Sequence, residues 1–131
     1  MPVSLDTPVS NATWFALPEN GDDFDFCETP YSGANAVWYE VIGNGNVLNA
    51  NTCGTGFNTK LHVFSGADCN SLTCIGGNDN SDCGSGSRVI FRSVPDQKYY
   101  ILVHGAFASS LGPYQLTVED LGTGALATVY P

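Results

Sequence analysis

The fold is indicated most clearly by residues 88–119, which read RVIFRSVPDQKYYILVHGAFASSLGPYQLTVE. Three runs rich in β-branched and aromatic residues are separated by the turn signals Pro95-Asp96 and Gly112-Pro113. Alternation within the first and last runs directs one set of side chains inward (Val89, Phe91, Leu116, Val118) and another outward (Arg88, Arg92, Gln115, Thr117).

The same pattern extends over the rest of the chain, and no helical period competes with it. Fifteen glycines and seven prolines suit short strands and tight turns better than long helices. The predicted strands are Ala12–Leu17, Phe24–Cys27, Ala36–Ile42, Val47–Thr52, Lys60–Ser65, Leu72–Ile75, Arg88–Ser93, Tyr99–His104, Tyr114–Glu119 and Ala125–Tyr130. This predicts an all-β protein, a jelly-roll-like antiparallel β-sandwich of about 8–10 short strands.

Length and charge limit the classes of function. A chain of 131 residues has room for one core, so we expect a single domain over residues 1–131. The net charge is −9, and the four basic residues are dispersed, which excludes nucleic acid and disfavours an anionic membrane surface as partners. No segment approaches the length of a membrane span, so we expect no membrane insertion.

Two strands are apolar on both faces, namely those that contain Val37-Trp38-Tyr39 and Tyr99–Val103. Central strands whose second face is covered by loops explain this pattern, and we favour that interpretation. The alternative is an exposed aromatic platform for sugars or a partner.

Five cysteines, four of them within a Gly/Asn/Ser-rich stretch, predict disulfides that staple the sandwich in an oxidising compartment. Zinc is disfavoured because no Cys-x-x-Cys pair is present, the tightest spacing being that of Cys69 and Cys74. Cys69 and Cys74 bracket a short loop and are predicted to pair. Cys53 is predicted to pair with Cys83, although a bridge from Cys27 to Cys53 competes with it. Cys27 or Cys83 would then be left over.

Asn11-Ala12-Thr13 is an acceptor sequence for N-glycosylation, which agrees with an extracellular or cell-surface location. Residues 1–20 lack the pattern of a signal peptide, so we expect the sequence to be a mature product or an excerpt.

Several motifs in order resemble one known family. They are Ala36-Val37-Trp38-Tyr39, Thr52-Cys53-Gly54, the run Phe57–Gly66 (FNTKLHVFSG), Asn78-Asp79-Asn80, Ser87–Phe91 (SRVIF), Lys98–Gly105 (KYYILVHG) and Gly112–Leu116 (GPYQL). Over residues 36–118 the chain resembles the bacterial pre-peptidase C-terminal domain and its eukaryotic relatives. The resemblance implies a jelly-roll-like sandwich that is not itself catalytic, appended to enzymes or repeated in adhesive proteins. Some relatives bind calcium, and some bind matrix polymers.

Two departures from the family pattern bear on calcium. Asn58 stands where the family typically has Asp, and Asn80 stands where it has the second of two consecutive acids. An amide keeps a carbonyl oxygen but loses the charge, so we expect a calcium site in these loops to be weakened or lost.

The candidate metal ligands fall in two acidic segments. They are Asp22, Asp23 and Asp25 in the first, and Asn78, Asp79 and Asp82 in the second. Such oxygen-rich side chains suit a hard cation, so calcium is the candidate cofactor. The alternative is that they cap turns through bonds to the backbone.

No catalytic set emerges, and we expect no enzyme. A triad of Ser109 or Ser110 with His104 lacks the strained turn that exposes a nucleophile. His62 is most simply one residue of a strand.

Function is then sought at the termini, outside the family-like motifs. Residues 1–18 and 121–131 both contain strand-like runs, which either extend their own sandwich or lie on the edge of a neighbouring copy. We predict a non-catalytic extracellular structural or adhesive module that associates with other copies of itself or with neighbouring modules. The alternative is an accessory module that binds polysaccharide or a matrix polymer.

Overall fold

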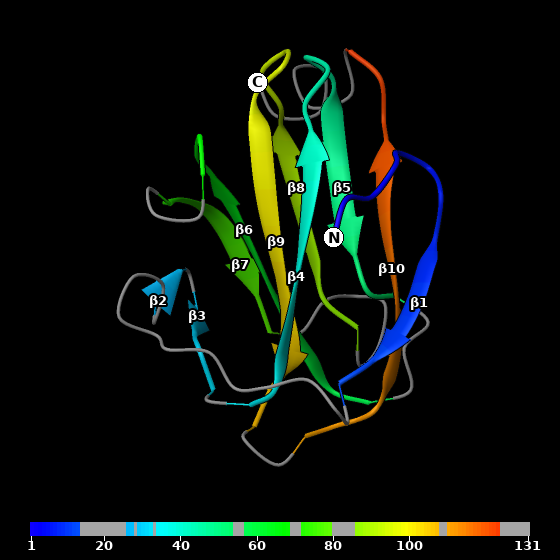
Figure 1. Ribbon diagram of the computed structural model, residues 1–131, viewed down its shortest axis with the longest axis vertical. Helices are drawn as coiled ribbons and strands as arrows, with labels where there is room; N and C mark the ends of the chain where they lie inside the picture. The colour runs from blue at the N-terminus through cyan, green and yellow to red at the C-terminus, as the bar shows by residue number, and fades with distance from the viewer. Residues whose placement is uncertain are drawn as a thin grey trace.

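The computed structural model describes residues 1–13, 26–27, 29–32, 34–53, 57–68, 72–79, 86–107 and 110–123 (Figure 1). These residues form ten strands: β1 (Val9–Ala12), β2 (Phe26–Cys27), β3 (Thr29–Pro30), β4 (Ala36–Ile42), β5 (Val47–Asn51), β6 (Thr59–Ser65), β7 (Thr73–Asn78), β8 (Arg88–Arg92), β9 (Lys98–Gly105) and β10 (Pro113–Asp120). The predicted strands over residues 14–17 and 125–130 lie outside the described residues.

The strands form two four-stranded antiparallel sheets that pack face to face (Figure 1). One sheet has the order β1-β10-β5-β8 and the other the order β4-β9-β6-β7, while β2 and β3 form a separate hairpin. This is the antiparallel β-sandwich that the sequence predicts.

The space between the sheets is filled by one apolar cluster, which we call the inner core. Its buried members are Tyr39, Val41, Leu48, Ala50, Leu61, Val63, Val89, Phe91, Tyr99, Ile101, Val103, Tyr114, Leu116 and Val118. The four side chains predicted to point inward from β8 and β10 are all among them. The hydroxyl groups of Tyr39 and Tyr114 share a hydrogen bond of 2.5 Å within this core. Burial raises the pKa of the Tyr114 hydroxyl.

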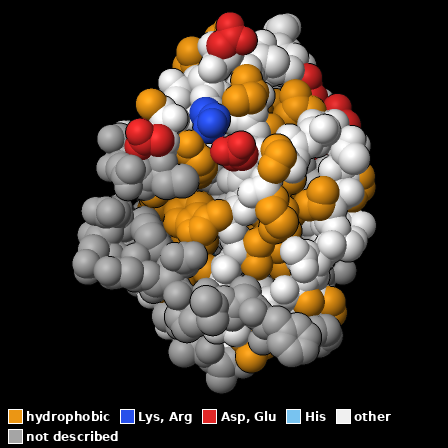
Figure 2. Space-filling view, viewed as in Figure 1, with side chains coloured by type: hydrophobic (Ala, Val, Ile, Leu, Met, Phe, Trp, Pro, Cys, Tyr) orange, Lys and Arg blue, Asp and Glu red, His pale blue; other side chains and the backbone are white. Residues whose placement is uncertain are grey.

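A second apolar cluster lies on the opposite face of the β4-β9-β6-β7 sheet, and we call it the outer cluster. It contains Cys27, Ala36, Phe64, Tyr100 and Leu102, with Tyr31, Trp38 and Leu72 packed against it. The segment between β2 and β4 contributes to this cluster, and we call its residues 27, 29–32 and 34 the strap. The strands with two apolar faces are therefore buried on both, as predicted. Figure 2 shows hydrophobic side chains gathered over the middle of one face of the molecule.

The N-terminal segment lies on its own sandwich. Glu40 of β4 exchanges backbone hydrogen bonds of 2.9 Å with Met1 and Val3, and β1 pairs with β10. Residues 1–12 thus run from the edge of one sheet to the edge of the other. The predicted extension over residues 1–18 is described as far as residue 13. In this part, β1 adds to the sheet of its own chain by pairing with β10.

The strand predicted over Leu72–Ile75 ends too early, because β7 continues through Gly76, Gly77 and Asn78. A Cβ atom at Gly77 would lie 1.9 Å from the carbonyl oxygen of Cys27, and one at Gly76 would lie 2.9 Å from Val89. The glycines are therefore required by the close approach of the strap and of β8, and not by a turn.

Candidate functional site

The family-like motifs meet at one end of the sandwich, which we call the motif end. β5 ends there at Asn51, β6 begins there at Thr59, and β9 ends there at Gly105. The register of the sheets brings these points together, since Thr59 pairs with Gly105 and Asn51 pairs with Arg88. Strand ends that are far apart in the sequence thus lie at the same end of the sandwich (Figure 1).

Buried hydroxyl groups tie these loops together. Thr52 and Thr59 share a hydrogen bond of 2.8 Å between their hydroxyl oxygens, and the amide of Ser87 donates to Thr52 at 3.0 Å. The Ser87 hydroxyl lies 2.6 Å from the carbonyl oxygen of Thr59 and 2.8 Å from that of Asp79. Thr52, Thr59 and Ser87 are completely buried, so this network holds β5, β6 and β8 in fixed relation.

Two side-chain oxygens at the motif end are buried without a hydrogen-bond partner, namely Oδ1 of Asn58 and Oδ1 of Asp79. Because buried polar atoms are nearly always paired, these two need an explanation. Asn78 differs, since its Oδ1 accepts a hydrogen bond of 3.2 Å from the amide of Arg88, which joins the end of β7 to the start of β8.

Asp120, at the end of the sandwich opposite the motif end, is a carboxylate whose oxygens have hydrogen-bond partners. It accepts hydrogen bonds from the amide of Gly122 and from the side chains of Asn44 and Asn46, and these bonds lower its pKa.

The predicted ligands Asp22, Asp23, Asp25 and Asp82 lie outside the described residues. Among the residues that the structure describes, no three His, Cys, Asp or Glu side chains gather into a metal-binding group.

The motif end also exposes apolar side chains. Phe107, between β9 and β10, is 66% exposed, and Leu111 is 39% exposed. Backbone hydrogen bonds flank their loop, from the amide of Ala106 to the carbonyl oxygen of Asn58 at 3.0 Å and from the amide of Thr13 to that of Gly112 at 2.9 Å. A Cβ atom at Gly112 would come within 2.8 Å of the Phe57 ring, which explains the glycine.

A histidine pair lies beneath the strap, and sequence reasoning missed it. Nε2 of His62 lies 2.8 Å from Nε2 of His104, and neither side chain has exposed surface. Burial lowers the pKa of His62 to about 4 and that of His104 to about 3. Both residues alternate with core positions in apolar strands, which was the available signal, but only the register of β6 against β9 brings the rings together.

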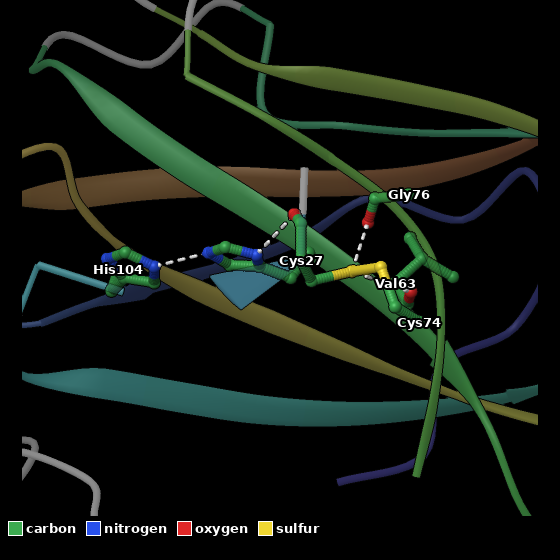
Figure 3. The surroundings of a disulfide bond; sticks show 6 residues. Cys27, Val63, Cys74, Gly76 and His104 are labelled. Carbon is green, nitrogen blue, oxygen red and sulfur yellow. Dashed lines mark hydrogen bonds between the residues drawn. A yellow bond between two sulfur atoms is a disulfide. The ribbon is translucent and has the colours of Figure 1, made fainter. Parts of the chain in front are cut away.

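The predicted disulfide between Cys69 and Cys74 is wrong, because Cys74 pairs with Cys27 (Figure 3). Their Cα atoms lie 5.5 Å apart although 47 positions separate them in the sequence. The loop length favoured the local bridge, but the β2–β3 hairpin packs beside β7 and brings Cys27 to Cys74. The Cys27 sulfur also contacts the carbonyl oxygen of Gly76 at 3.3 Å.

The alternative bridge from Cys27 to Cys53 is wrong for the same reason, and Cys27 is not the unpaired cysteine. Cys53 is disulfide-bonded, and its partner lies outside the described residues, as does Cys83. The pairing of Cys53 with Cys83 therefore stays a prediction.

The predicted glycosylation site lies on an edge strand. Asn11 is exposed on β1, whereas Thr13 is completely buried, with its hydroxyl accepting a hydrogen bond of 3.0 Å from the amide of Gly112. Glycosylation of Asn11 stays a prediction.

Within the described residues there is no helix of the length and hydropathy needed to cross a membrane.

Neither a protein-family model nor a curated protein matches the sequence. Among solved structures, the chain is similar to the pre-peptidase C-terminal domain of collagenase from Bacillus anthracis, with 15% identity, coverage of 89% of this chain and 91% of that one, and a TM-score of 0.56. It is also similar to PliG from Aeromonas hydrophila, a periplasmic inhibitor of g-type lysozyme, with 16% identity, coverage of 89% and 93%, and a TM-score of 0.52. At these identities the likeness shows the fold alone. The chain therefore has the β-sandwich fold of the pre-peptidase C-terminal domain, as its motifs predict.

Proposed function

We propose that the chain is a non-catalytic extracellular binding module that contacts its ligand with the motif end. The observation that carries this proposal is the exposure of Phe107, 66%, in a loop held by hydrogen bonds on both sides. Exposed aromatic side chains are favoured contact residues in recognition sites. Leu111, 39% exposed in the same loop, extends the apolar surface.

An extracellular location is supported by the disulfide chemistry. The Cys27–Cys74 bridge and the bonded state of Cys53 require an oxidising compartment to persist. The family resemblance points the same way, since it implies modules of secreted and surface proteins.

The absence of catalysis is supported by the surroundings of His104. The Ser32 hydroxyl lies 3.1 Å from Nδ1 of His104, but it also donates to the carbonyl oxygen of Gly105 at 2.7 Å. The ring itself is completely buried, so a substrate cannot reach the nitrogen atoms that would act as the base.

Polysaccharide or a matrix polymer is the ligand class that the family resemblance implies. The periplasmic lysozyme inhibitor adds a protein partner as a second class. Cosedimentation of the purified chain with insoluble chitin, cellulose or collagen tests the first class, and a pull-down with purified lysozyme tests the second.

The matched variants are Phe107→Ala and Val94→Ala. Val94 is 56% exposed in the loop between β8 and β9, at the opposite end of the sandwich. We expect Phe107→Ala to weaken binding about tenfold or more and Val94→Ala to leave it unchanged. Equal binding by the two variants would overturn the assignment of the motif end.

We also propose that a hard cation, calcium by preference, completes the motif end. The support is the pair of unpartnered buried oxygens, on Asn58 and Asp79, since carboxylate and amide oxygens are calcium ligands. Both residues belong to motifs that the family resemblance singles out. The two amides that replace family acids make low affinity the expected result.

Thermal unfolding with added calcium and with chelator tests the cation. The wild-type chain should melt at a higher temperature with calcium, Asn58→Asp should enlarge this shift, and Asp79→Asn should abolish it. Asp96→Asn is the control, because it removes the same charge at the opposite end, where an exposed Asp96 has a φ of 65° that Asn tolerates. An identical calcium shift in Asp79→Asn and Asp96→Asn would contradict the site.

Self-association into a structural or adhesive assembly is the second candidate. It is favoured by the outer edges of β7 and β8, neither of which pairs with a further described strand, and by Ile75 and Ile90, each 40% exposed there. The N-terminal strand offers it no support, since β1 pairs with β10 of the same chain. Light scattering after size-exclusion chromatography tests it, and a monomer at every concentration would exclude it.

A further inference from the structure

The histidine pair is the middle of a chain of polar contacts that links the strap to the sheet. The carbonyl oxygen of Cys27 lies 3.2 Å from Nδ1 of His62, and the two Nε2 atoms lie 2.8 Å apart (Figure 3). Nδ1 of His104 lies 2.8 Å from the carbonyl oxygen of Gly105. Both outer atoms of this chain are carbonyl oxygens, which only accept.

Counting protons shows that the neutral pair cannot satisfy the whole chain. Each of the three contacts needs one N–H group, whereas two neutral imidazole rings carry one proton each. One contact is therefore left with two lone pairs facing each other. The proton position decides which contact this is.

In one arrangement His62 donates to Cys27, and His104 donates to His62 through its Nε2. Nδ1 of His104 is then bare, and the single Ser32 hydroxyl proton can turn from the Gly105 carbonyl oxygen, 2.7 Å away, to this nitrogen, 3.1 Å away. In the other arrangement His104 donates to Gly105, and His62 loses its bond to Cys27. Ser32 has an acceptor in both arrangements, Nδ1 of His104 in the first and the Gly105 carbonyl oxygen in the second, so only the first arrangement keeps the bond from His62 to Cys27.

One added proton supplies the third N–H group and completes the chain. A second added proton cannot be accommodated, because two N–H groups would then face each other across 2.8 Å and two charged rings would stack with centroids 5.0 Å apart. The positive charge of Lys60 on β6 opposes protonation of both rings. Around the rings, β7 contributes the backbone of Gly77, and the strap contributes Tyr31, Ser32 and the Cys27 carbonyl.

We propose that His62 and His104 form an acid-operated latch, which holds the strap on the sheet until the pair takes its second proton and then releases the Ser32 end. The separating His104 ring moves against Ser32 and against the Tyr31 ring, which is perpendicular to it with the two ring centroids 4.9 Å apart. The Cys27 end stays attached through its disulfide to Cys74, so the strap opens as a tethered flap. Opening exposes Tyr100 and Leu102 of the outer cluster, which are 5% and 0% exposed in the closed state.

The test is an acid titration of the ¹⁵N-labelled chain by NMR, with the histidine ring nitrogens and the backbone amides followed together. The rings should stay neutral near pH 7, with midpoints at least about 30-fold more acidic than that of an ordinary histidine. The amides of Thr29, Tyr31 and Ser32 should shift or broaden with the more acidic ring midpoint. The amides of Leu48 and Leu116, in the other sheet, should not change at that pH.

Variants separate the latch from general acid unfolding. In His104→Gln the amide cannot take up a proton, so the strap amides should lose their transition while those of Leu48 stay native-like. Removal of both Cys27 and Cys74 should let the strap open at less acidic pH. Strap amides that stay constant through both ring titrations would overturn the proposal, as would a strap transition unchanged in His104→Gln. Should His104→Gln fail to fold, the coincidence of strap and ring midpoints in the wild-type chain decides by itself.

Discussion

The two apolar clusters on either side of the β4-β9-β6-β7 sheet are buried equally well but held in different ways. Leu61 of the inner core and Leu102 of the outer cluster both have no exposed surface. The inner core is enclosed by a second hydrogen-bonded sheet, which cannot move without breaking its strand pairing. The outer cluster is covered by the strap, which contacts the sheet through one disulfide, side-chain hydrogen bonds and the Tyr31 ring, while β2 and β3 pair only with each other among the described strands.

This difference indicates that burial and resistance to opening are separate properties. Opening free energy follows the number of contacts that must break together, and loops tied by few bonds lie at the low end of the scale. The inner core thus provides stability, whereas the outer cluster can respond to acid or reduction.

The largest expected effect comes from a matched pair of truncations. Leu61→Ala should lower the free energy of unfolding by about 3–5 kcal/mol, because the cavity that it leaves lies between two sheets that cannot collapse around it. Leu102→Ala should lower the free energy of unfolding by less, about 2–3 kcal/mol, because the strap can move inward and fill part of the cavity. Urea unfolding at neutral pH measures both. A larger loss for Leu102→Ala would invert the comparison.

Removal of the Cys27–Cys74 bridge by Cys27→Ala together with Cys74→Ala should lower the free energy of unfolding by about 4 kcal/mol. The reason is that the bridge restricts the unfolded chain over a separation of 47 positions. The measurement is urea unfolding of the double variant against the wild-type chain. The variant should remain folded, with backbone amide protection in β5 and β10 preserved. Loss of protection in those strands first would show that the inner core depends on the strap.

Acid should lower stability through the histidine pair. Both pKa values are lower in the folded chain, at about 4 and about 3, than the ordinary value of 6.5, so the unfolded chain binds more protons. The pair therefore has no effect above about pH 7, and stability falls as the pH drops from 6.5 towards 4 and 3. By about pH 5 the loss amounts to roughly 4 kcal/mol, as an order of magnitude.

The control for this pH dependence is the double variant His62→Gln with His104→Gln, which removes every histidine from the chain. Its unfolding free energy should be nearly independent of pH between about 7 and 5, where carboxylates remain ionised. If the unfolding free energy fell with pH equally steeply in the variant and in the wild-type chain, the histidine pair would be excluded as the source of the pH dependence.

The smallest expected effect compares single hydroxyl groups. Tyr39→Phe leaves the Tyr114 hydroxyl buried in the inner core without its partner and should cost about 1–3 kcal/mol. Ser32→Ala removes a half-buried hydroxyl of the strap, which water can replace, and should cost less than about 1 kcal/mol. Thermal unfolding resolves the two, and equal losses would contradict the distinction between core and strap.

Several parts of this molecule could be predicted from local patterns. The alternation that places Val89 and Leu116 inward follows from the two-residue period of a strand, which needs no knowledge of partners. The aromatic runs of β4 and β9 likewise indicated a sheet buried on both faces. The glycines of β7 misled, because a glycine that permits close approach and a glycine that permits a turn are identical in sequence.

The candidate site was less predictable. Asp79 was identified from its motif, but its unpartnered oxygen depends on packing at the motif end. Phe107 was not singled out, because nothing in its neighbours distinguishes an exposed aromatic residue from a buried one.

By itself, the sequence determined the class of fold, the expectation of disulfides and the acidic surface, since these depend on composition and short-range periodicity. Only the tertiary structure decided that Cys27 pairs with Cys74, that His62 meets His104, and that dispersed motifs share one end. The physical reason is that such contacts join residues separated by tens of positions. Their pairing is selected by the free energy of packing the whole chain, which no local pattern records.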